Sequence, residues 1–442
     1  MSLNPRFITY FHDTFFTGKE EEFQAFLESL NKSIPRTIRI KPGKEQEVIK
    51  RLETYGFLLE STNIANVFSL GRSEHFDPLE RRIGFTLDHL IGNFYIQELA
   101  AATSVNILTD GKIHDEPFLV LDMASSPGGK TTQLSEHYPR AFIIANEPTR
   151  ERIPQLLQNL DRMGSANIGV TLYPGQYFRH SPETFDKILL DAPCSGEGTL
   201  FKGTDATKHW HIKNIKNIAA LQTKLFDAAI IALKVGGEMV YSTCSMNLLE
   251  NEGVIASIEK KYPNTFQVTY QKRFWPHIDG TGGFFVAKII KIASIEINEK
   301  DRPNAPNTKI FKLGKSEIDN ILSKDIILYT HDNKILALQK NKHLEAIREK
   351  YYFMRFGEKI GTLDSVKIAL DAFSHRYISL EGIDTYEIRD ENELDNYLRG
   401  GILSVSDKDG PYILKYQGNI ISLEERNDGI STNNFPTDWL RK

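Results

Sequence analysis

Two cysteines stand out because each follows an apolar run of the kind that forms a buried strand. Cys194 lies three residues after the run KILLD ends at Asp191, and Cys244 lies two residues after EMVYS ends at Ser242. A thiolate can act as a covalent nucleophile, whereas a cysteine inside a strand is usually a small buried hydrophobic residue. Because both thiols follow their strands, where open α/β sheets bind ligands, we predict that two sulfur atoms take part in chemistry at one site.

A loop of small residues follows another apolar run, in FLVLDMASSPGGKTTQL. The run ends at Asp122, and a helix opens at Thr131 after Gly128 and Gly129. Backbone N–H groups at such a helix start can approach a ligand closely. The phosphate-binding pattern GxxxxGK[ST] is the alternative, but Ala124 occupies its first glycine position. The loop therefore favours a nucleotide-like cofactor over a triphosphate.

An acidic residue, Glu147, ends the next run, FIIANE. A carboxylate at the end of the second strand can accept hydrogen bonds from ribose hydroxyls, which suits nicotinamide dinucleotides and S-adenosylmethionine alike. The alternative is an exposed glutamate whose charge favours a helix N-terminus. We interpret Glu147 as a residue that binds the cofactor.

Two thiols beside a methyl sulfonium suit the methylation of an unreactive ring carbon. Carbon 5 of cytosine is a poor nucleophile until a thiolate adds at carbon 6. After methyl transfer the proton on carbon 5 leaves and the thioether is eliminated, which a second polar group can assist. Asp191 is placed to hydrogen-bond the cytosine edge and stabilise charge at its ring nitrogen. It could also cap the turn after its strand.

The elements that must position these residues are five apolar runs that alternate with helical stretches between about 115 and 290. The runs are FLVLD, FIIAN, IGVTL, KILLD and EMVYS. This alternation predicts a mainly parallel, Rossmann-like α/β sheet with helices on both faces. The runs FQVTY and GGFFVAKIIK leave no room for a long crossover helix, so they predict an antiparallel hairpin at one edge.

Residues 1–80 predict an α+β region that contains a basic strand. In PRTIRIKPGK, Ile38 and Ile40 alternate with polar residues that include Arg39 and Lys41, a half-buried pattern with a basic outer face. The stretch from Arg36 to Arg51 is rich in lysine and arginine. It is either a solvated edge or a strip that contacts RNA phosphates.

The C-terminal part of the sequence predicts two small domains after a linker. Residues 293–309 are polar and contain two prolines, which is typical of a linker. Residues 310–375 predict a small α+β domain, and residues 376–442 are rich in strands. Within them PYILKYQGNIISL predicts a hairpin with its turn at Gly418-Asn419.

The composition of the 442 residues is that of a globular protein with two to four domains. No apolar run approaches the roughly 18 residues that a membrane span needs. The N-terminus lacks the pattern of a secretory signal, so we expect a cytoplasmic protein. The net charge of −4 means that any contact with nucleic acid must come from local patches. Two thiols in a reducing compartment are not expected to form a structural disulfide.

The segments DMASSPGGKTTQL, DAPCSGEGT and YSTCS with ENE close behind resemble the RNA cytosine-C5 methyltransferase family, which includes RsmB, RsmF and the NSUN proteins. Three further segments, PRTIRIKP, HLIGNFYIQELAA and RFWPHIDGTGGFFVAKIIK, are similar to that family, so the likeness extends through most of the chain. The last segment, YILKYQGNIISLEERNDGISTNNFPTDWLR, resembles the PUA-like RNA-binding module of the RsmF subfamily. The resemblance implies a class I methyltransferase domain at 81–292.

The resemblance also implies the roles of single residues. Cys244 is implied as the nucleophile and Cys194 as the thiol that aids product release, with S-adenosylmethionine as the cofactor. An acidic residue that the family usually carries after the third strand is missing near Pro174, and Gln176 could supply an amide contact instead. The cofactor-binding positions are Ala124, Ser125, Ser126, Pro127, Gly128, Gly129, Lys130, Glu147, Gln176 and Asp191.

The implied partner is RNA, with 16S ribosomal RNA or the small ribosomal subunit expected first. A transfer-RNA methyltransferase and a non-catalytic ribosome-assembly protein are the alternatives. We expect no metal site, because the sequence has no CxxC or HExxH motif. We also expect a monomer. His209 and His211 flank Trp210, which either lines the substrate entrance or is a buried tryptophan at a helix start. A chain that ends near residue 292 is expected to bind the cofactor but to methylate RNA poorly.

Overall fold

The computed structural model describes residues 3–73, 82–203, 207–208, 210–297, 310–314, 316, 318–364, 367–405 and 408–439. The chain forms two compact units. Unit 1 contains Met1–Phe76, Phe94–Asn159 and Val170–Ala305. Unit 2 contains Asp77–Asn93, Leu160–Gly169 and Pro306–Lys442. Two short segments from the first half of the sequence therefore belong to the unit that the C-terminal residues form.

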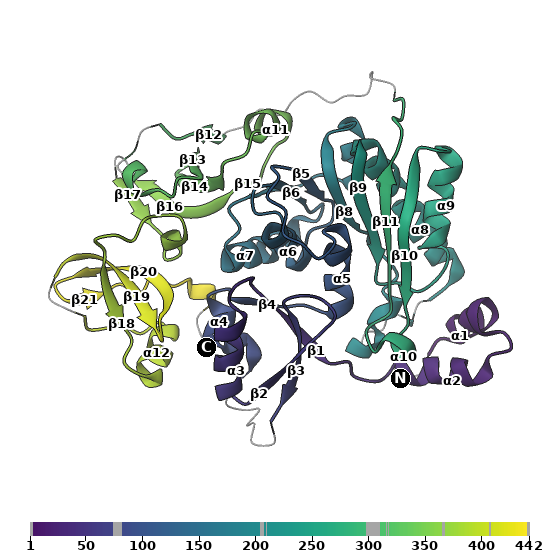
Figure 1. The fold of residues 1–442 in the computed structure, drawn as a ribbon, viewed down its shortest axis with the longest axis horizontal. Helices are drawn as coiled ribbons and strands as arrows, with labels where there is room; N and C mark the ends of the chain where they lie inside the picture. Colours follow the sequence, from purple (N-terminus) through teal and green to yellow (C-terminus); the bar gives the residue numbers. More distant parts are fainter. Residues whose placement is uncertain are drawn as a thin grey trace. The chain divides into compact units, whose positions relative to one another are not determined.

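A large sheet lies at the centre of unit 1, with the strand order β10-β11-β9-β8-β5-β6-β7 (Figure 1). Strand β5 pairs in parallel with β6 and β8, and β8 pairs in parallel with β9. The bounds are β5 (Leu119–Asp122), β6 (Phe142–Asn146), β7 (Ile168–Thr171), β8 (Phe185–Asp191) and β9 (Leu233–Thr243). These are the five predicted apolar runs, and the Rossmann-like fold is confirmed.

Helices cover this sheet on both faces, which is why the strands β5, β6 and β7 are buried along their whole length rather than alternating. Helix α5 (Leu99–Leu108) packs against α6 (Gly129–His137), and α8 (Ile212–Ala232) packs against α9 (Glu252–Lys261). Strand β10 (Phe266–Phe274) pairs antiparallel with β11 (Phe284–Lys291), which in turn pairs antiparallel with β9. The hairpin predicted at the sheet edge is therefore confirmed.

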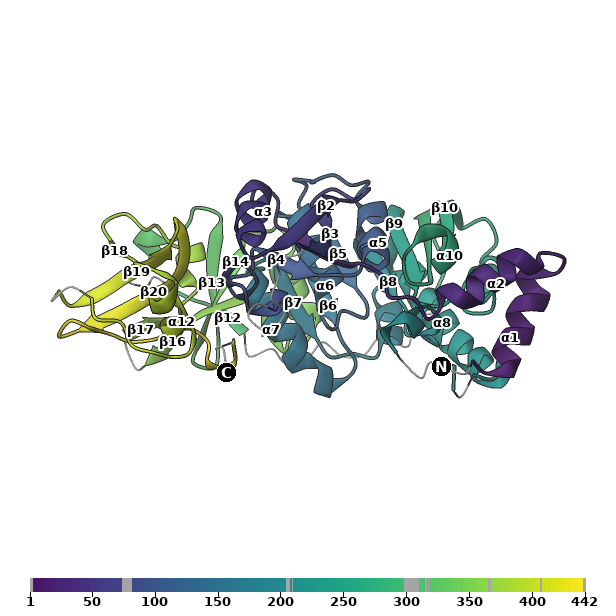
Figure 2. The same cartoon turned by 90° about the horizontal axis from the view of Figure 1, so that it is seen from below.

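A smaller sheet and a group of short helices complete unit 1. The sheet has the order β2-β3-β1-β4, with bounds β1 (Arg36–Ile40), β2 (Phe57–Ser61), β3 (Val67–Arg72) and β4 (Phe94–Ile96). The helices are α1 (Pro5–Phe11), α2 (Glu20–Ser29), α3 (Glu45–Thr54) and α10 (Pro276–Asp279). Helix α2 lies against α10, as both views show (Figures 1 and 2). Aromatic side chains of α1 and α2 pack with Trp210 and Trp275 in one cluster.

The basic strip predicted from Arg36 to Arg51 is wrong at two of its positions. Arg39 is only 1% exposed, and its guanidinium donates to the Gly129 carbonyl at 2.8 Å and to Glu136 at 2.8 Å. Arg51 is buried as well. Strand β1 pairs with β3 along one edge and with β4 along the other, and its residues from Thr37 to Ile40 are buried. Arg36 and Lys44 are exposed, and the Lys44 ammonium group pairs with Glu47 at 3.1 Å.

Unit 2 contains two sheets, of order β12-β13-β14-β16-β17 and β18-β19-β20-β21. The strands of the first sheet are β12 (Ile310–Lys312), β13 (Ile326–His331), β14 (Lys334–Gln339), β16 (Glu358–Asp364) and β17 (Lys367–Leu370). Those of the second are β18 (Asp384–Glu387), β19 (Gly410–Tyr416), β20 (Asn419–Asn427) and β21 (Ile430–Ser431). The short strand β15 (Arg355–Phe356) is followed by Gly357, whose N–H donates to the Ile168 carbonyl at 2.9 Å. The helices are α4 (Leu87–Leu90), α11 (Leu344–Lys350) and α12 (Glu391–Leu398).

The hairpin predicted near the C-terminus is present, but its turn is one residue earlier than predicted. Tyr416 pairs with Asn419, and the two residues between them, Gln417 and Gly418, have φ values of 49° and 77°. Two left-handed residues define a tight hairpin turn whose twist matches that of the strands. The likeness of this region to a PUA module and the five-part domain division stay predictions. Most of the predicted linker, 298–309, lies outside the described residues.

Candidate active site

The two thiols predicted to act together meet at one edge of the large sheet. Strands β8 and β9 are parallel neighbours in which Asp191 pairs with Ser242. The loops that follow both strands therefore leave the sheet side by side. The Sγ atoms of Cys194 and Cys244 lie 2.8 Å apart, within hydrogen-bond distance for two sulfurs, and both residues are half-buried free thiols. One small ligand could contact both sulfurs.

A cation and a carboxylate lie beside this thiol pair. Lys130, in the first turn of α6, donates from Nζ to Asp191 Oδ2 at 2.7 Å, and Ser242 Oγ donates to the other carboxylate oxygen at 2.7 Å. Burial acts to lower the pKa of Lys130, but the Asp191 carboxylate and then the Cys244 sulfur outweigh it and raise that pKa. Lys130 therefore keeps its positive charge next to Cys244.

Cys194 has a different electrostatic environment from that of Cys244. Its hydrogen bond with Cys244, its burial and the negative charges of Cys244 and Glu250 all raise the pKa of the Cys194 thiol, against a smaller lowering by the Gly196 N–H. Cys194 is therefore held as a protonated thiol, whereas Cys244 faces the ammonium group of Lys130. The two thiols therefore lie beside groups of opposite charge.

The predicted cofactor loop, residues 124–130, leaves the end of β5 and leads into α6. Gly128 precedes the helix with φ of 107°, a left-handed conformation that favours glycine. A Cβ on Gly128 or Gly129 would lie 3.2 Å from Leu156 Cδ1 or 3.0 Å from Tyr95 Cε1. Leu156 and Tyr95 therefore pack closely against the backbone of the two glycines. The N–H groups at the helix start suit a ligand that binds at the carboxyl ends of the strands. The loop fits the predicted cofactor.

Glu147 follows the end of β6 but its carboxylate is only 1% exposed. It accepts from the Thr149 N–H at 2.9 Å and the Ser126 N–H at 3.3 Å, and Arg152 lies 3.4 Å away. Glu147 thus links the cofactor loop to the segment after β6. A ribose hydroxyl that binds Glu147, as predicted, would donate to a carboxylate oxygen that already accepts from one of these groups.

Gln176 is half-buried in the turn after β7, where Tyr173 and Tyr177 stack with ring centroids 4.1 Å apart. Asn146, the last residue of β6, fixes this turn: its Nδ2 donates to the Tyr173 carbonyl at 2.9 Å, and its Oδ1 accepts from the Tyr173 N–H at 3.0 Å. Sequence reasoning missed Asn146, although it directly precedes the predicted Glu147. The turn without the usual acidic residue is therefore well ordered by an amide.

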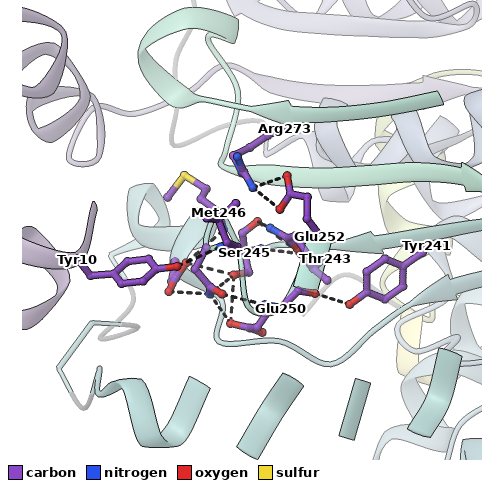
Figure 3. A network of polar contacts seen from close by, with 12 residues as sticks. Tyr10, Tyr241, Thr243, Ser245, Met246, Glu250, Glu252 and Arg273 are labelled. Atoms are coloured by element: carbon purple, nitrogen blue, oxygen red, sulfur yellow. Dashed lines mark hydrogen bonds and ion pairs between the residues drawn. The ribbon is translucent and has the colours of Figure 1, made fainter. Parts of the chain in front are cut away.

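Two buried glutamates that the sequence analysis did not assign connect the thiol loops: Glu197 accepts from the Met246 N–H at 3.2 Å, and Glu250, which Figure 3 labels, accepts from the Ser195 N–H at 2.9 Å. Glu197 follows Cys194 by three residues and Glu250 follows Cys244 by six, and both are fully buried. The motifs GEGT and ENE contain these two glutamates, so the sequence analysis quoted both residues without a role. Their contacts depend on which strands are neighbours, which the motifs alone do not show.

Trp210 is buried in the aromatic cluster of the N-terminal helices. His211 precedes α8 and its Nδ1 accepts from the Lys213 N–H at 3.0 Å, so this segment is a helix start with a buried tryptophan. His209 lies outside the described residues. Across the part of the chain that the structure describes, no group of three or more potential ligands could hold a metal ion. In that same part, no helix combines the length and apolar character that crossing a membrane requires.

The strand order, the loop before α6 and the paired thiols together define a Rossmann-like methyltransferase. The family model described as 16S rRNA methyltransferase RsmB/F matches residues 111–290. The Ribosomal RNA small subunit methyltransferase F of Shewanella piezotolerans is 32% identical over 412 residues, which cover 83% of this chain and 86% of the relative. The protein of that name in Erwinia tasmaniensis is 30% identical over 461 residues, 95% of this chain and 94% of the relative.

Solved structures agree with this fold. A methyltransferase homolog from Pyrococcus horikoshii is 28% identical, with a TM-score of 0.54 over 66% of this chain and all of that chain. NSun6 from the same organism, solved with SFG, is 21% identical and has a TM-score of 0.57 over 66% of this chain and 99% of that chain, which shows the fold alone. The chain belongs to the RsmB/F family and is an RNA methyltransferase. Its family uses S-adenosylmethionine, which confirms the predicted cofactor.

Proposed function

We propose that this chain methylates carbon 5 of a cytosine in 16S ribosomal RNA through a covalent adduct between Cys244 and carbon 6. The observation that carries the proposal is the thiol pair, 2.8 Å apart, with Lys130 on the side of Cys244. The names and coverage of the relatives support ribosomal RNA as the substrate. The cytoplasm, where such RNA is assembled, and a monomeric state belong to the same proposal.

Each residue of the site has a role in this chemistry. The Cys244 sulfur lies beside the ammonium group of Lys130 and adds to carbon 6, which makes carbon 5 nucleophilic. Asp191 is 29% exposed at its side chain, and its carboxylate accepts a hydrogen bond from the exocyclic amino group of the cytosine, which orients the ring. S-adenosylmethionine, when bound at residues 124–130 with Glu147 and Gln176, supplies the methyl group as a sulfonium.

The release step falls to Cys194. When the proton on carbon 5 passes to a water molecule, its electron pair re-forms the double bond between carbons 5 and 6, and the bond between carbon 6 and Cys244 breaks to return the thiolate. Cys194, within hydrogen-bond distance, stabilises the departing sulfur by donating its S–H, which its raised pKa keeps in place. Without that donor the Cys244 thiolate is a poorer leaving group, and the covalent adduct persists.

Bisulfite sequencing of total RNA from a deletion strain, compared with its parent, tests the proposal. We expect one or more cytosines of 16S ribosomal RNA to lose protection in the deletion strain and to regain it with the wild-type gene but not with Cys244→Ala. Methylation lost only from a transfer RNA would make that RNA the substrate. No loss at any cytosine would favour a non-catalytic role in assembly.

A further inference from the structure

A buried glutamine of α8 contacts the loop that contains Cys194. Gln222 is fully buried, and its Nε2 donates to the Pro193 carbonyl at 2.8 Å and to Glu250 Oε2 at 2.9 Å. A backbone carbonyl can only accept, so the nitrogen of the amide faces Pro193, and its second hydrogen reaches Glu250. The sequence analysis assigned no role to this glutamine.

The carboxylate of Glu250 completes the contact with the Cys194 loop. The oxygen that accepts from Gln222 also accepts from the Ser195 N–H at 2.9 Å. Pro193 and Ser195 are the residues directly before and after Cys194 in the chain. The backbone on both sides of this thiol is therefore bound by two buried side chains that are also bound to each other.

Helices and strands hold the two side chains in turn. Gln222 lies within α8, which packs against β8 and β9. The Glu250 carbonyl accepts from the Tyr241 hydroxyl of β9 at 2.5 Å (Figure 3), and Glu250 Oε1 accepts from Asn247 Nδ2 at 2.7 Å. A site that is supported by helices and strands is held more precisely than one that rests on loops alone. The Cys194 loop is therefore anchored to the central sheet and to the helix beside it.

Loss of the Gln222 amide would act mainly on the Cys194 loop. Glu250 would keep the Ser195 N–H and Asn247 Nδ2 as donors, but the Pro193 carbonyl would lose the hydrogen bond from Gln222. Cys244 is attached through other contacts, since its carbonyl accepts from the Gly198 N–H at 2.9 Å. The two thiols should therefore respond differently to a change at position 222.

The release step depends on the position of Cys194 because it requires a hydrogen bond between two sulfur atoms. The Sγ atoms of Cys194 and Cys244 lie 2.8 Å apart. A hydrogen bond weakens steeply when its geometry is lost, and a displacement of about 1 Å at a reacting group can slow a reaction about a hundredfold. A displaced Cys194 would assist the departing sulfur poorly, whereas the attack of Cys244 on carbon 6 does not use it.

We propose that Gln222 is a positioning residue for Cys194, which binds the backbone around this thiol together with Glu250 and so keeps its S–H directed at Cys244 for product release. The consequence for catalysis rests on the function proposed above. Removal of the Gln222 amide should therefore leave the first methyl transfer nearly unchanged and slow the turnovers that follow it.

Gln222→Met tests the contact without RNA or cofactor, because methionine has a similar length and volume but no hydrogen to donate. We expect Cys194 to react with iodoacetamide about tenfold faster in this variant, since local opening of the loop exposes the thiol. Gln133→Met is the matched control: Gln133 is also fully buried in unit 1, and its Nε2 donates to the Ala102 carbonyl at 3.1 Å. The control should lose stability without a change in the alkylation rate of Cys194.

Kinetics with small-subunit RNA and S-adenosylmethionine separate a positioning role from a purely structural one. We expect the first turnover of Gln222→Met to stay within about twofold of wild type, steady-state turnover to fall about tenfold, and a protein–RNA adduct to accumulate on a denaturing gel. A general loss of structure would slow the first and the later turnovers together. Addition of Gln222→Met to Cys194→Ala should have no further effect, because both changes impair the same step.

The proposal is overturned if Gln222→Met leaves the alkylation rate of Cys194 unchanged, or if it slows the first and the later turnovers equally. It is also overturned if the double variant turns over more slowly than Cys194→Ala alone. If Gln222→Met does not fold, Gln222→Asn replaces it, since asparagine keeps the amide on a side chain that is one methylene group shorter. The same changes are then expected, and the same results would overturn the proposal.

Cys194→Ala on the same gel separates this inference from the proposed function. An adduct with Cys194→Ala but not with Gln222→Met would overturn the role of Gln222 and leave the covalent mechanism intact. No adduct with either variant would contradict the release role of Cys194. The alkylation rates would then decide by themselves whether Gln222 holds the thiol in place.

Discussion

The two sulfur atoms of the site are neighbours but have opposite charges beside them. Cys244 faces the ammonium group of Lys130, and Cys194 faces the carboxylate of Glu250. In the sequence both cysteines follow a strand, and only the resemblance to a family ordered their roles. The charges now supply a physical reason for the role of Cys194, because a thiol keeps its proton beside an anion and can then donate it in the release step.

Lys130→Met should lower the reactivity of Cys244 and methyl transfer together. Loss of roughly 1.4 kcal/mol of attraction corresponds to about a tenfold slower reaction. The rate of iodoacetamide labelling at Cys244, followed by mass spectrometry of the peptides, measures this without RNA. Lys187→Met is the matched control, since Lys187 is also a partly buried lysine paired with a carboxylate, that of Glu238. Equal labelling rates in Lys130→Met and wild type would show that the charge of Lys130 does not affect the reactivity of Cys244.

At the scale of elements, the start of β11 fixes the thiol loop. Gly198 donates its N–H to the Cys244 carbonyl at 2.9 Å and accepts from the Gly283 N–H at 3.1 Å. A Cβ at Gly198 would lie 1.7 Å from the Gly283 carbonyl oxygen, so the two backbones approach as closely as glycine allows. The hairpin β10–β11 therefore closes the sheet edge and also holds the loop that contains Gly198 next to Cys244.

Gly198→Ala should destabilise unit 1 by about 1–3 kcal/mol, the usual cost of forcing extra volume into a packed site. The backbone of Cys244 is displaced as well, so the rate of methyl transfer should fall by more than the loss in the free energy of unfolding alone would explain. Gly84→Ala is the control, since a Cβ there meets nothing within 4 Å. Chemical denaturation of both variants measures the difference. An unchanged free energy of unfolding in Gly198→Ala would show that the loops can separate at no cost.

Local patterns predicted the strands of the large sheet but not every side chain. The runs from FLVLD to EMVYS are apolar along their whole length, and this property requires no knowledge of distant residues. Arg39 was different: its alternation with Ile38 and Ile40 predicted exposure, whereas its partner Glu136 lies 97 residues further along the chain. Glu197 and Glu250 were visible as letters, but their reciprocal contact depends on β8 and β9 being neighbours.

At the scale of the whole molecule, unit 2 takes residues from three parts of the chain. Leu87, Leu90 and Ile91 share a core with Tyr397 and other C-terminal residues. A sequence boundary near 293 suggested that the chain could be cut there without harm to the methyltransferase domain. The core of unit 2 predicts instead that a cut at that point harms the remaining chain, because these apolar side chains would lose the C-terminal residues against which they pack.

A chain that ends at residue 292 should therefore unfold at a lower temperature than the full chain and should aggregate, because it exposes contiguous apolar surface. Calorimetry and light scattering of the two proteins measure this. Replacement of Leu87 by aspartate in the full chain should have a similar but smaller effect. A truncated chain as stable and as monodisperse as the full chain would show that segment 77–93 does not depend on the C-terminal residues.

The covalent use of two thiols is tested most directly by a denaturing gel of protein incubated with small-subunit RNA and S-adenosylmethionine. Cys194→Ala should give a slowly migrating protein–RNA band, because Cys244 still attacks and its release is slowed. Cys244→Ala and the double variant should give none, and methyl transfer by Cys244→Ala should fall at least about a thousandfold. A band with Cys244→Ala but not with Cys194→Ala would exchange the two roles. Full methylation by Cys244→Ala would contradict the covalent mechanism.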